Sequence, residues 1–265
     1  MDLGVAGKVA IITGGSDGIG RAAAERLSAE GALVAVVSRT QSDLDTAAAE
    51  ISASTGNEVV GIAADVKDES AVEAMVKSVV ERWGRLDILV NNYGKASQGK
   101  WQSLSIRDWI DIYEINTLSI VRMVQRFSTE MPVGSRIINL GTIGSTRPNN
   151  VMPHYYSAKG ALATLTVSLA KELGPRGINV NLVSPGLIKT AEVEAQYLRR
   201  AKESGWGDDF SAAEAKIAET FFPNPLNRIA TREEVADVVL FLASARASFV
   251  NGQNIRVDGG AVDVV

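Results

Sequence analysis

A phenol and an ammonium group stand four residues apart in Tyr155-Tyr156-Ser157-Ala158-Lys159, at the start of a run with helical apolar spacing. Residues four apart in a helix lie on the same face. A neighbouring cation stabilises a phenolate and lowers its pKa from the usual value of about 10. Tyrosine beside lysine is therefore a usable proton donor or acceptor. The alternative is an aromatic residue packed at a helix start, with a solvated lysine one turn later.

A glycine-rich turn lies far upstream of this pair. The β-branched run Lys8–Thr13 predicts a strand buried on both faces, and the sequence TGGSDGIG continues from it. Its Gly14, Gly18 and Gly20 permit a tight turn, a close approach of the backbone to a phosphate, and tight packing of the helix expected over 21–30. The N-terminal dipole of that helix would face the same anion. The alternative is a turn that binds nothing.

The end of the next expected strand, over residues 32–37, bears on the choice of dinucleotide. Ser38-Arg39-Thr40 follow it. An acid at this place would bind the 2′-hydroxyl of NAD, whereas an arginine pairs with the 2′-phosphate of NADP. Arg39 therefore favours NADP(H) over NAD(H). The alternative is a surface arginine on a helix-entry loop.

Two further strands, expected over 58–63 and 86–90, also end in polar residues. Asp65 either accepts a hydrogen bond from an adenine amino group or caps the helix expected over 68–83. The turn-forming cluster Asn91-Asn92-Tyr93-Gly94 follows the other strand. Ligands of open α/β sheets bind at the carboxyl ends of the strands, so these residues are expected to meet there.

The second half of the chain continues the alternation of helices and strands. A long helix is expected over 106–131, with Asn116 as a buried amide that needs partners. The other expected elements are strands over 136–140, 178–183 and 254–257, the helix from Tyr155 to Leu173, and a helix that starts at Thr231 with Glu234 in a capping box. Ser184-Pro185-Gly186 is expected to end the strand over 178–183. The segment 191–222 is expected to be a helical flap over the substrate, and residues 1–265 to form a single domain.

Composition excludes several classes of function. The 265 residues are 46% hydrophobic and hold no cysteine and a single histidine, His154, so disulfides, thiolate chemistry and a histidine-rich metal site are not expected. A net charge of -4 provides no basic stripe for nucleic acid. The N-terminal segment shows neither a signal peptide nor a membrane span. We expect a cytoplasmic protein that acts on a small molecule.

These motifs together resemble the classical branch of the short-chain dehydrogenase/reductase family. The resemblance runs in order from about Lys8 to Gly260 and rests on TGGSDGIG, Asn91-Asn92-x-Gly94, Asn116, Thr142, Tyr155 with Lys159, and Pro185-Gly186. It implies a Rossmann-like, doubly wound parallel sheet with helices on both faces and a nicotinamide cofactor across its carboxyl edge. It also implies homotetramers, which would assemble through the helices over 106–131 and 155–173.

The resemblance implies a role for each catalytic position. Tyr155 would exchange a proton with the carbonyl oxygen, Lys159 would lower the pKa of that tyrosine and hold the nicotinamide ribose, and Asn116 would hold a relay water. Thr142, thirteen residues before Tyr155, stands where the family has serine and would orient the carbonyl oxygen. This thirteen-residue spacing from Thr142 selects Tyr155 over Tyr156 as the acid. Contacts to the cofactor are implied for Gly14, Ser16, Ile19, Asp65, Asn92, Ile188 and Thr190.

Three residues depart from the family pattern. Thr142 adds a methyl group that stiffens the side chain, and Gly141 replaces a polar residue. Tyr93 replaces a small residue, so that it either shifts the wall behind the cofactor or reaches toward the substrate. None of these changes removes a catalytic group.

The expected activity is NADPH-dependent reduction of a ketone or aldehyde, or the reverse oxidation of an alcohol. A close alternative is reduction of a 3-oxoacyl thioester on an acyl carrier protein. The aromatic residues of the segment 191–222 argue mildly against that alternative, unless they serve ordinary packing. A third interpretation is a sensor that binds NADPH without turnover.

Overall fold

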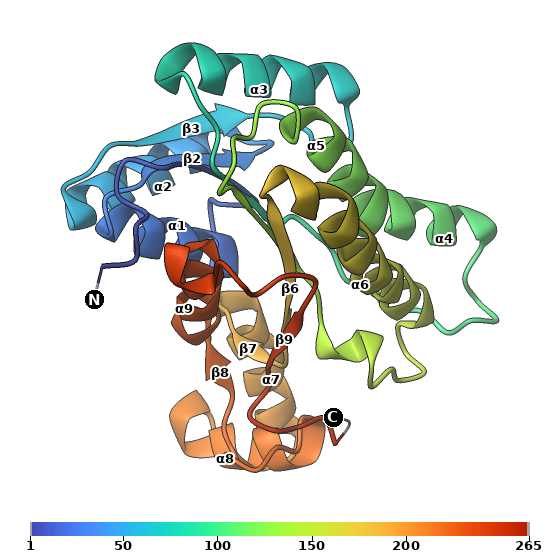
Figure 1. Ribbon diagram of the computed structural model, residues 1–265. Helices are drawn as coiled ribbons and strands as arrows, with labels where there is room; N and C mark the ends of the chain where they lie inside the picture. The colour runs from blue at the N-terminus through green and yellow to red at the C-terminus, as the bar shows by residue number, and fades with distance from the viewer. Residues whose placement is uncertain (1, 264–265) are drawn as a thin grey trace.

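The strands expected from the sequence assemble into one parallel sheet in the computed structural model, which describes residues 2–263 (Figure 1). Their order across the sheet is β3-β2-β1-β4-β5-β6-β9. The strands are β1 (Val9–Thr13), β2 (Leu33–Ser38), β3 (Val59–Ala63), β4 (Ile88–Asn91), β5 (Arg136–Leu140), β6 (Asn179–Pro185) and β9 (Asn254–Val257). This is the expected doubly wound α/β architecture.

Helices cover both faces of the sheet (Figure 1). One hydrophobic core joins the sheet to α1 (Gly18–Ala29), α2 (Gln41–Thr55) and α9 (Arg232–Ala243), and a second core joins it to α3 (Glu69–Trp83), α5 (Ser119–Phe127) and α6 (Pro153–Leu173). Within β1, Ile12 belongs to the first core and Ile11 to the second. Successive side chains of a strand point to opposite faces, so a sheet buried on both sides requires the continuous apolar runs seen in the sequence.

The strand order reverses at β1. Ile11 pairs with Ala35 of β2 on one side and with Leu89 of β4 on the other. The chain therefore leaves the carboxyl ends of β1 and β4 in opposite directions, which opens a crevice between their loops. The glycine-rich loop after β1 and Asn91-Asn92-Tyr93-Gly94 after β4 meet at this crevice.

The prediction of one long helix over 106–131 is wrong. It comprises α4 (Ile106–Tyr113), a π-helical turn η1 (Glu114–Leu118) and α5, which ends at Phe127. The cause lies at Asn116, whose Nδ2 donates to the Ile112 carbonyl four residues earlier at 3.0 Å. A side chain that competes for a backbone carbonyl disturbs the helical hydrogen-bond ladder, and π-turns arise at such places.

The expected end of the sixth strand is also wrong. β6 continues through Pro185 because β9 pairs with its last residues, Ser184 with Arg256 and Pro185 with Val257. Proline has no N–H to donate, and the N–H of Gly186 donates to the Val257 carbonyl instead at 2.9 Å. The capping box of α9 is confirmed, since Thr231 and Glu234 bond reciprocally.

The segment 191–222 folds as two helices, α7 (Ala191–Glu203) and α8 (Phe210–Phe221), at the bottom of Figure 1. They have a small hydrophobic core of their own, in which Phe210, Ile217 and Ile229 are buried and Trp206 is packed against them. We call the segment 191–222 the lid. A short second sheet of β7 (Ile188–Lys189) and β8 (Ala230–Thr231) connects it to α9. Within residues 2–263, none of the helices combines the length and apolar character that crossing a membrane requires.

Candidate active site

The glycine-rich loop is held closed by the residues after β4. The amide Nδ2 of Asn92 donates to the carbonyls of Thr13 and Gly14, both at 3.0 Å. Gly14 has φ +63°, and a Cβ built on Gly20 would lie 2.2 Å from the Gly14 carbonyl oxygen. No side chain fits at Gly20, so the loop packs directly on the first turn of the helix. The Asn92 Nδ2 group thus shapes the loop, and the contact of Asn92 with a cofactor stays a prediction.

The N-terminus of α1 is suited to an anion. The helix begins at Gly18, three residues before its expected start, and its N-cap, Asp17, makes no side-chain hydrogen bond to it. Gly18 has φ +58° and lies beside Thr190, whose methyl group would be 4.0 Å from an added Cβ. The first turn of α1 holds no acidic residue. Its free N–H groups and helix dipole therefore remain available to a phosphate.

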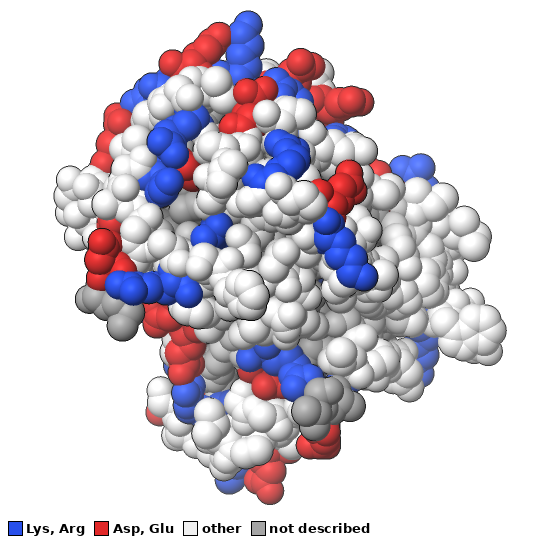
Figure 2. All heavy atoms as spheres, in the orientation of Figure 1, with Lys and Arg blue, Asp and Glu red and all other residues white. Residues whose placement is uncertain are grey.

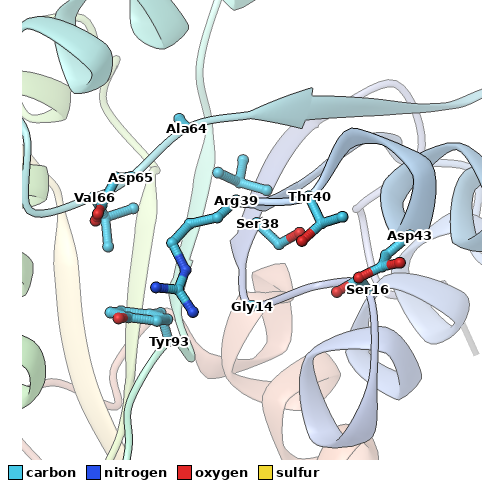
Figure 3. A pocket seen from close by; sticks show the side chains of 11 residues that line it. Gly14, Ser16, Ser38, Arg39, Thr40, Asp43, Ala64, Asp65, Val66 and Tyr93 are labelled. Carbon is cyan, nitrogen blue, oxygen red and sulfur yellow. The ribbon is translucent and has the colours of Figure 1, made fainter.

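A cavity of about 200 Å³ opens beside this loop (Figure 3). Among the residues that line it are Gly14, Ser16, Ser38, Arg39, Asp43, Asp65 and Tyr93. Arg39 extends across it toward the ring of Tyr93, while Asp43 and Ser16 lie at the other end. The hydroxyl of Ser38 is buried and has no hydrogen-bond partner among residues 2–263. These features fit the adenosine part of a dinucleotide with a 2′-phosphate.

Two alternatives left open by the sequence are decided at this cavity. Asp68, not Asp65, caps α3, accepting from the N–H groups of Ser70 and Ala71. Asp65 lines the cavity and accepts from the N–H of Lys67 at 3.0 Å. Tyr93 also lines this cavity and not the cleft that contains Tyr155, which favours a wall behind the cofactor over a contact with the substrate.

Lys159 lies deep below the surface, with 3% of it exposed. Its Nζ donates to the Leu140 carbonyl at 2.7 Å, and burial lowers its pKa to about 8. A Cβ built on Gly94 would lie 3.3 Å from this Nζ and 2.8 Å from Oδ1 of Asn116. Gly94 therefore lets two catalytic candidates approach the same point.

The buried amide of Asn116 has the partners that it requires. Its Nδ2 donates to the carbonyls of Lys95 and Ile112, and its Oδ1 accepts from the N–H of Lys95 at 3.1 Å. The side chain thus fastens the loop after β4 to the π-helical turn. The role of Asn116 as the holder of a relay water stays a prediction, and its side-chain amide is already engaged.

The pKa of Tyr155 is raised to about 12, chiefly because burial disfavours the phenolate. The neighbouring phenol of Tyr156 raises it further, and a hydrogen bond from the Thr142 hydroxyl lowers it in part. Lys159 is not among the causes of this shift, and its role in lowering the pKa of Tyr155 stays a prediction. The desolvation that penalises the phenolate also penalises the ammonium ion that should stabilise it. Tyr155 is consequently a protonated phenol at neutral pH, ready to donate.

A cleft of about 600 Å³ brings several predicted site residues together, but neither Lys159 nor Asn116 lines it. Thr142 and Tyr155 line it, and so do Ile19, Ile188 and Thr190. The lid contributes Tyr197, Phe221 and Phe222, whereas Trp206 and Phe210 belong to the core of the lid. The aromatic residues of the segment 191–222 thus divide between cleft wall and ordinary packing.

Sequence reasoning missed three polar residues of this cleft, Arg147, Asn149 and Tyr156. Arg147 Nη1 donates to the Ala261 carbonyl at 2.6 Å, which joins the loop after β5 to the C-terminal segment. Asn149 Nδ2 donates to the hydroxyl of Tyr156 at 2.9 Å. The loop has no periodicity that could have indicated these contacts, and adjacency to Tyr155 was the sole signal for Tyr156.

Groups of three or more metal-ligating side chains do not occur in the described chain.

Comparison with known proteins identifies the family. A family model described as enoyl-(acyl carrier protein) reductase matches residues 14–262. The short-chain reductase protein NovJ of Streptomyces niveus is 36% identical over 95% of this chain and 93% of its own length. The chain belongs to the short-chain dehydrogenase/reductase family. It is therefore an oxidoreductase of a family whose members act on carbonyl and alcohol groups.

Two further members of the short-chain dehydrogenase/reductase family are similar over their full lengths. The 3-oxoacyl-[acyl-carrier-protein] reductase FabG of Vibrio harveyi is 34% identical over 97% of this chain and 98% of its own. The crystal structure of L-sorbose reductase from Gluconobacter frateurii, complexed with NADPH and L-sorbose, has a TM-score of 0.93 and 34% identity, with both chains covered completely. This structural match shows that the two chains share the same overall fold.

Proposed function

We propose that this protein is an NADP(H)-dependent carbonyl reductase that uses Tyr155 as its proton donor. The observation that carries the proposal is that Tyr155 and Thr142 line one cleft with the expected nicotinamide contacts Ile188 and Thr190. A donor must lie within hydrogen-bond reach of the group it protonates, and a substrate in this cleft meets that condition. The adenosine cavity and the α1 N-terminus fit the rest of the cofactor.

Each residue has a defined task in this proposal. NADPH, when bound, supplies the hydride. Tyr155 donates its proton to the carbonyl oxygen, and the Thr142 hydroxyl orients that oxygen by a second hydrogen bond. Lys159, fastened to the Leu140 carbonyl, provides positive charge behind the phenol. Tyr197, Phe221 and Phe222 of the lid limit the access of water to the reacting groups.

Two substrate classes follow from the relatives. The likeness to L-sorbose reductase supports a hydroxylated ketone, and the likeness to FabG supports a 3-oxoacyl thioester. The rate of NADPH consumption, monitored by the absorbance of NADPH, should be compared for a ketose, simple ketones, aldehydes and a 3-oxoacyl thioester. Turnover of at least one carbonyl compound supports the proposed function. Tight binding of NADPH without turnover of any member of this panel contradicts it.

The preference for NADP(H) rests on the cavity around Arg39. Its guanidinium lies within the adenosine cavity, where it can pair with a 2′-phosphate. Asp43 also lines the cavity, but it lies at the end away from the guanidinium (Figure 3). We therefore propose that the 2′-phosphate binds at the Arg39 end.

Arg39→Ala should lower kcat/KM for NADPH by about 10- to 100-fold, the worth of one or two charge-assisted hydrogen bonds. The value for NADH should change by less than about threefold, because NADH lacks the phosphate. Steady-state kinetics with both cofactors measures the difference. Arg82→Ala, at an exposed position in the last turn of α3, is the matched control. An equal loss with the two cofactors would contradict the assignment.

We also propose that the protein is a homotetramer, as the family resemblance implies. Large apolar side chains remain exposed on the helices expected to form the interfaces, with Ile106 at 76%, Ile110 at 54% and Val167 at 42%. Charges of both signs are intermixed over most of the face in Figure 2, whereas the surface over α4 is largely uncharged. Apolar exposure of this kind is typical of an interface. Light scattering should give four times the chain mass of 28.1 kDa, and a monomer mass would refute this proposal.

A further inference from the structure

A second phenol, that of Tyr156, lies in the substrate cleft next to the proton donor. Tyr155 and Tyr156 follow each other at the start of α6, and their ring centroids are 5.6 Å apart with planes tilted by 55°. Both side chains line the cleft. The Tyr156 ring rests directly on Gly144, where an added Cβ would come 2.0 Å from a ring carbon. The loop after β5 therefore has space for this ring because residue 144 is glycine.

Asn149 determines how the Tyr156 hydroxyl is oriented. Its Oδ1 accepts a hydrogen bond from the N–H of Val151 at 3.0 Å, so its Nδ2 is the atom that faces Tyr156. That Nδ2 donates to the phenol oxygen at 2.9 Å. A phenol that accepts in this way still has its own hydrogen to donate. Among residues 2–263, no group accepts that hydrogen.

The Tyr156 phenol remains neutral under ordinary conditions, because burial raises its pKa. A neutral donor that faces a cleft is satisfied when a ligand oxygen accepts its hydrogen. Tyr155 and Tyr156 line the same cleft with ring centroids 5.6 Å apart, so hydrogen bonds from both phenols can reach one ligand. In a ketone that carries one further oxygen, the two oxygens lie nearest each other when the second is on the adjacent carbon.

We propose that Tyr156 determines substrate specificity by donating a hydrogen bond to a second substrate oxygen, on the carbon adjacent to the carbonyl that Tyr155 protonates. Asn149 is the positioning residue that presents the Tyr156 hydroxyl. The substrates are accordingly α-hydroxyketones and 1,2-diketones, with the matching diols as products. This inference rests on the proposed carbonyl reduction and extends it to a substrate class.

The test compares ketones that differ by one hydroxyl group. Reduction by NADPH is measured for butanone, acetoin, and the isomer of acetoin whose hydroxyl is at the far end of the chain, and also for acetophenone and its α-hydroxy derivative. The wild-type protein should prefer each α-hydroxyketone over its parent ketone by about tenfold in kcat/KM, the worth of one hydrogen bond. Tyr156→Phe should remove this preference, mainly by raising KM for the α-hydroxyketone.

Asn149→Ala should partly reduce the preference for α-hydroxyketones, because it leaves the Tyr156 phenol in place without the amide that orients it. Asn150→Ala, the same substitution at a neighbouring residue that does not line the cleft, should retain the preference. An unchanged preference in Tyr156→Phe, or an equal preference for the far-end isomer, overturns the role of Tyr156 and leaves carbonyl reduction standing. If the ketones are not reduced but an aldehyde or a 3-oxoacyl thioester is, the role of Tyr156 is overturned and carbonyl reduction stands. If no carbonyl compound is reduced, or if Tyr155→Phe reduces its substrate as fast as wild type, the proposed function itself is overturned.

Discussion

Tyr155→Phe should lower kcat/KM for carbonyl reduction by about a thousandfold, within the range that a positioned general acid contributes. The substitution removes one oxygen atom and leaves the ring in place, so the cleft keeps its shape. Burial keeps this phenol protonated, with a pKa of about 12, so the wild-type residue carries its proton throughout the neutral range. Steady-state kinetics with the best ketone of the panel measures the loss.

The binding of NADPH should survive this substitution, because the adenosine cavity and the glycine-rich loop are formed by other residues. Titration of the variant with NADPH tests this point separately. Tyr113→Phe, at the end of α4 and outside both cavities, is the matched tyrosine control. A Tyr155→Phe variant that is as active as wild type would show that another group protonates the substrate.

Lys159→Met should change how stability depends on pH. The pKa of Lys159 is about 8 in the folded chain and 10.5 when lysine is exposed. Between these values the unfolded chain holds a proton that the folded chain has released, so the wild-type protein gains stability as pH rises through this window. Below about pH 8 the folded state bears the full cost of the buried charge. Methionine does not titrate and occupies a similar volume.

The free energy of unfolding of wild type relative to Lys159→Met should therefore rise by roughly 2 kcal/mol between about pH 7 and about pH 9.5. Denaturant unfolding of both proteins at the two pH values measures this difference of differences. The tyrosines titrate alike in both proteins and largely cancel. Lys171→Met, which removes an exposed lysine from the same helix, is the control. Parallel pH dependence of the two curves would mean that Lys159 is not desolvated as described.

Together, the two experiments separate two effects of burial at this site. Burial raises the pKa of Tyr155 and at the same time lowers the pKa of Lys159. A reductase needs its donor protonated, which a tyrosine of ordinary pKa already is at neutral pH, and the raised pKa makes Tyr155 a weaker acid. Oxidation of an alcohol needs the phenolate, for which this environment is unfavourable.

Much of the fold follows from local patterns in the sequence. Short runs of β-branched residues predicted β1 to β5 with ends that agree to within two residues, because a strand covered on both faces must be apolar along its whole length. The four-residue spacing of Tyr155 and Lys159 placed both on α6, because helical periodicity depends on neighbours alone. The family resemblance added the doubly wound topology.

Contacts between distant segments decided the rest. The π-helical turn at Asn116 depends on the loop after β4, the end of β6 depends on β9, and the wall formed by Tyr93 depends on where the chain crosses the sheet. The pKa of Tyr155 depends on how much protein surrounds it, and the pair of Asn149 and Tyr156 on a loop without periodicity. Local spacing fixes which face of an element a side chain occupies, whereas its solvation and its partners are set only when distant elements pack against it.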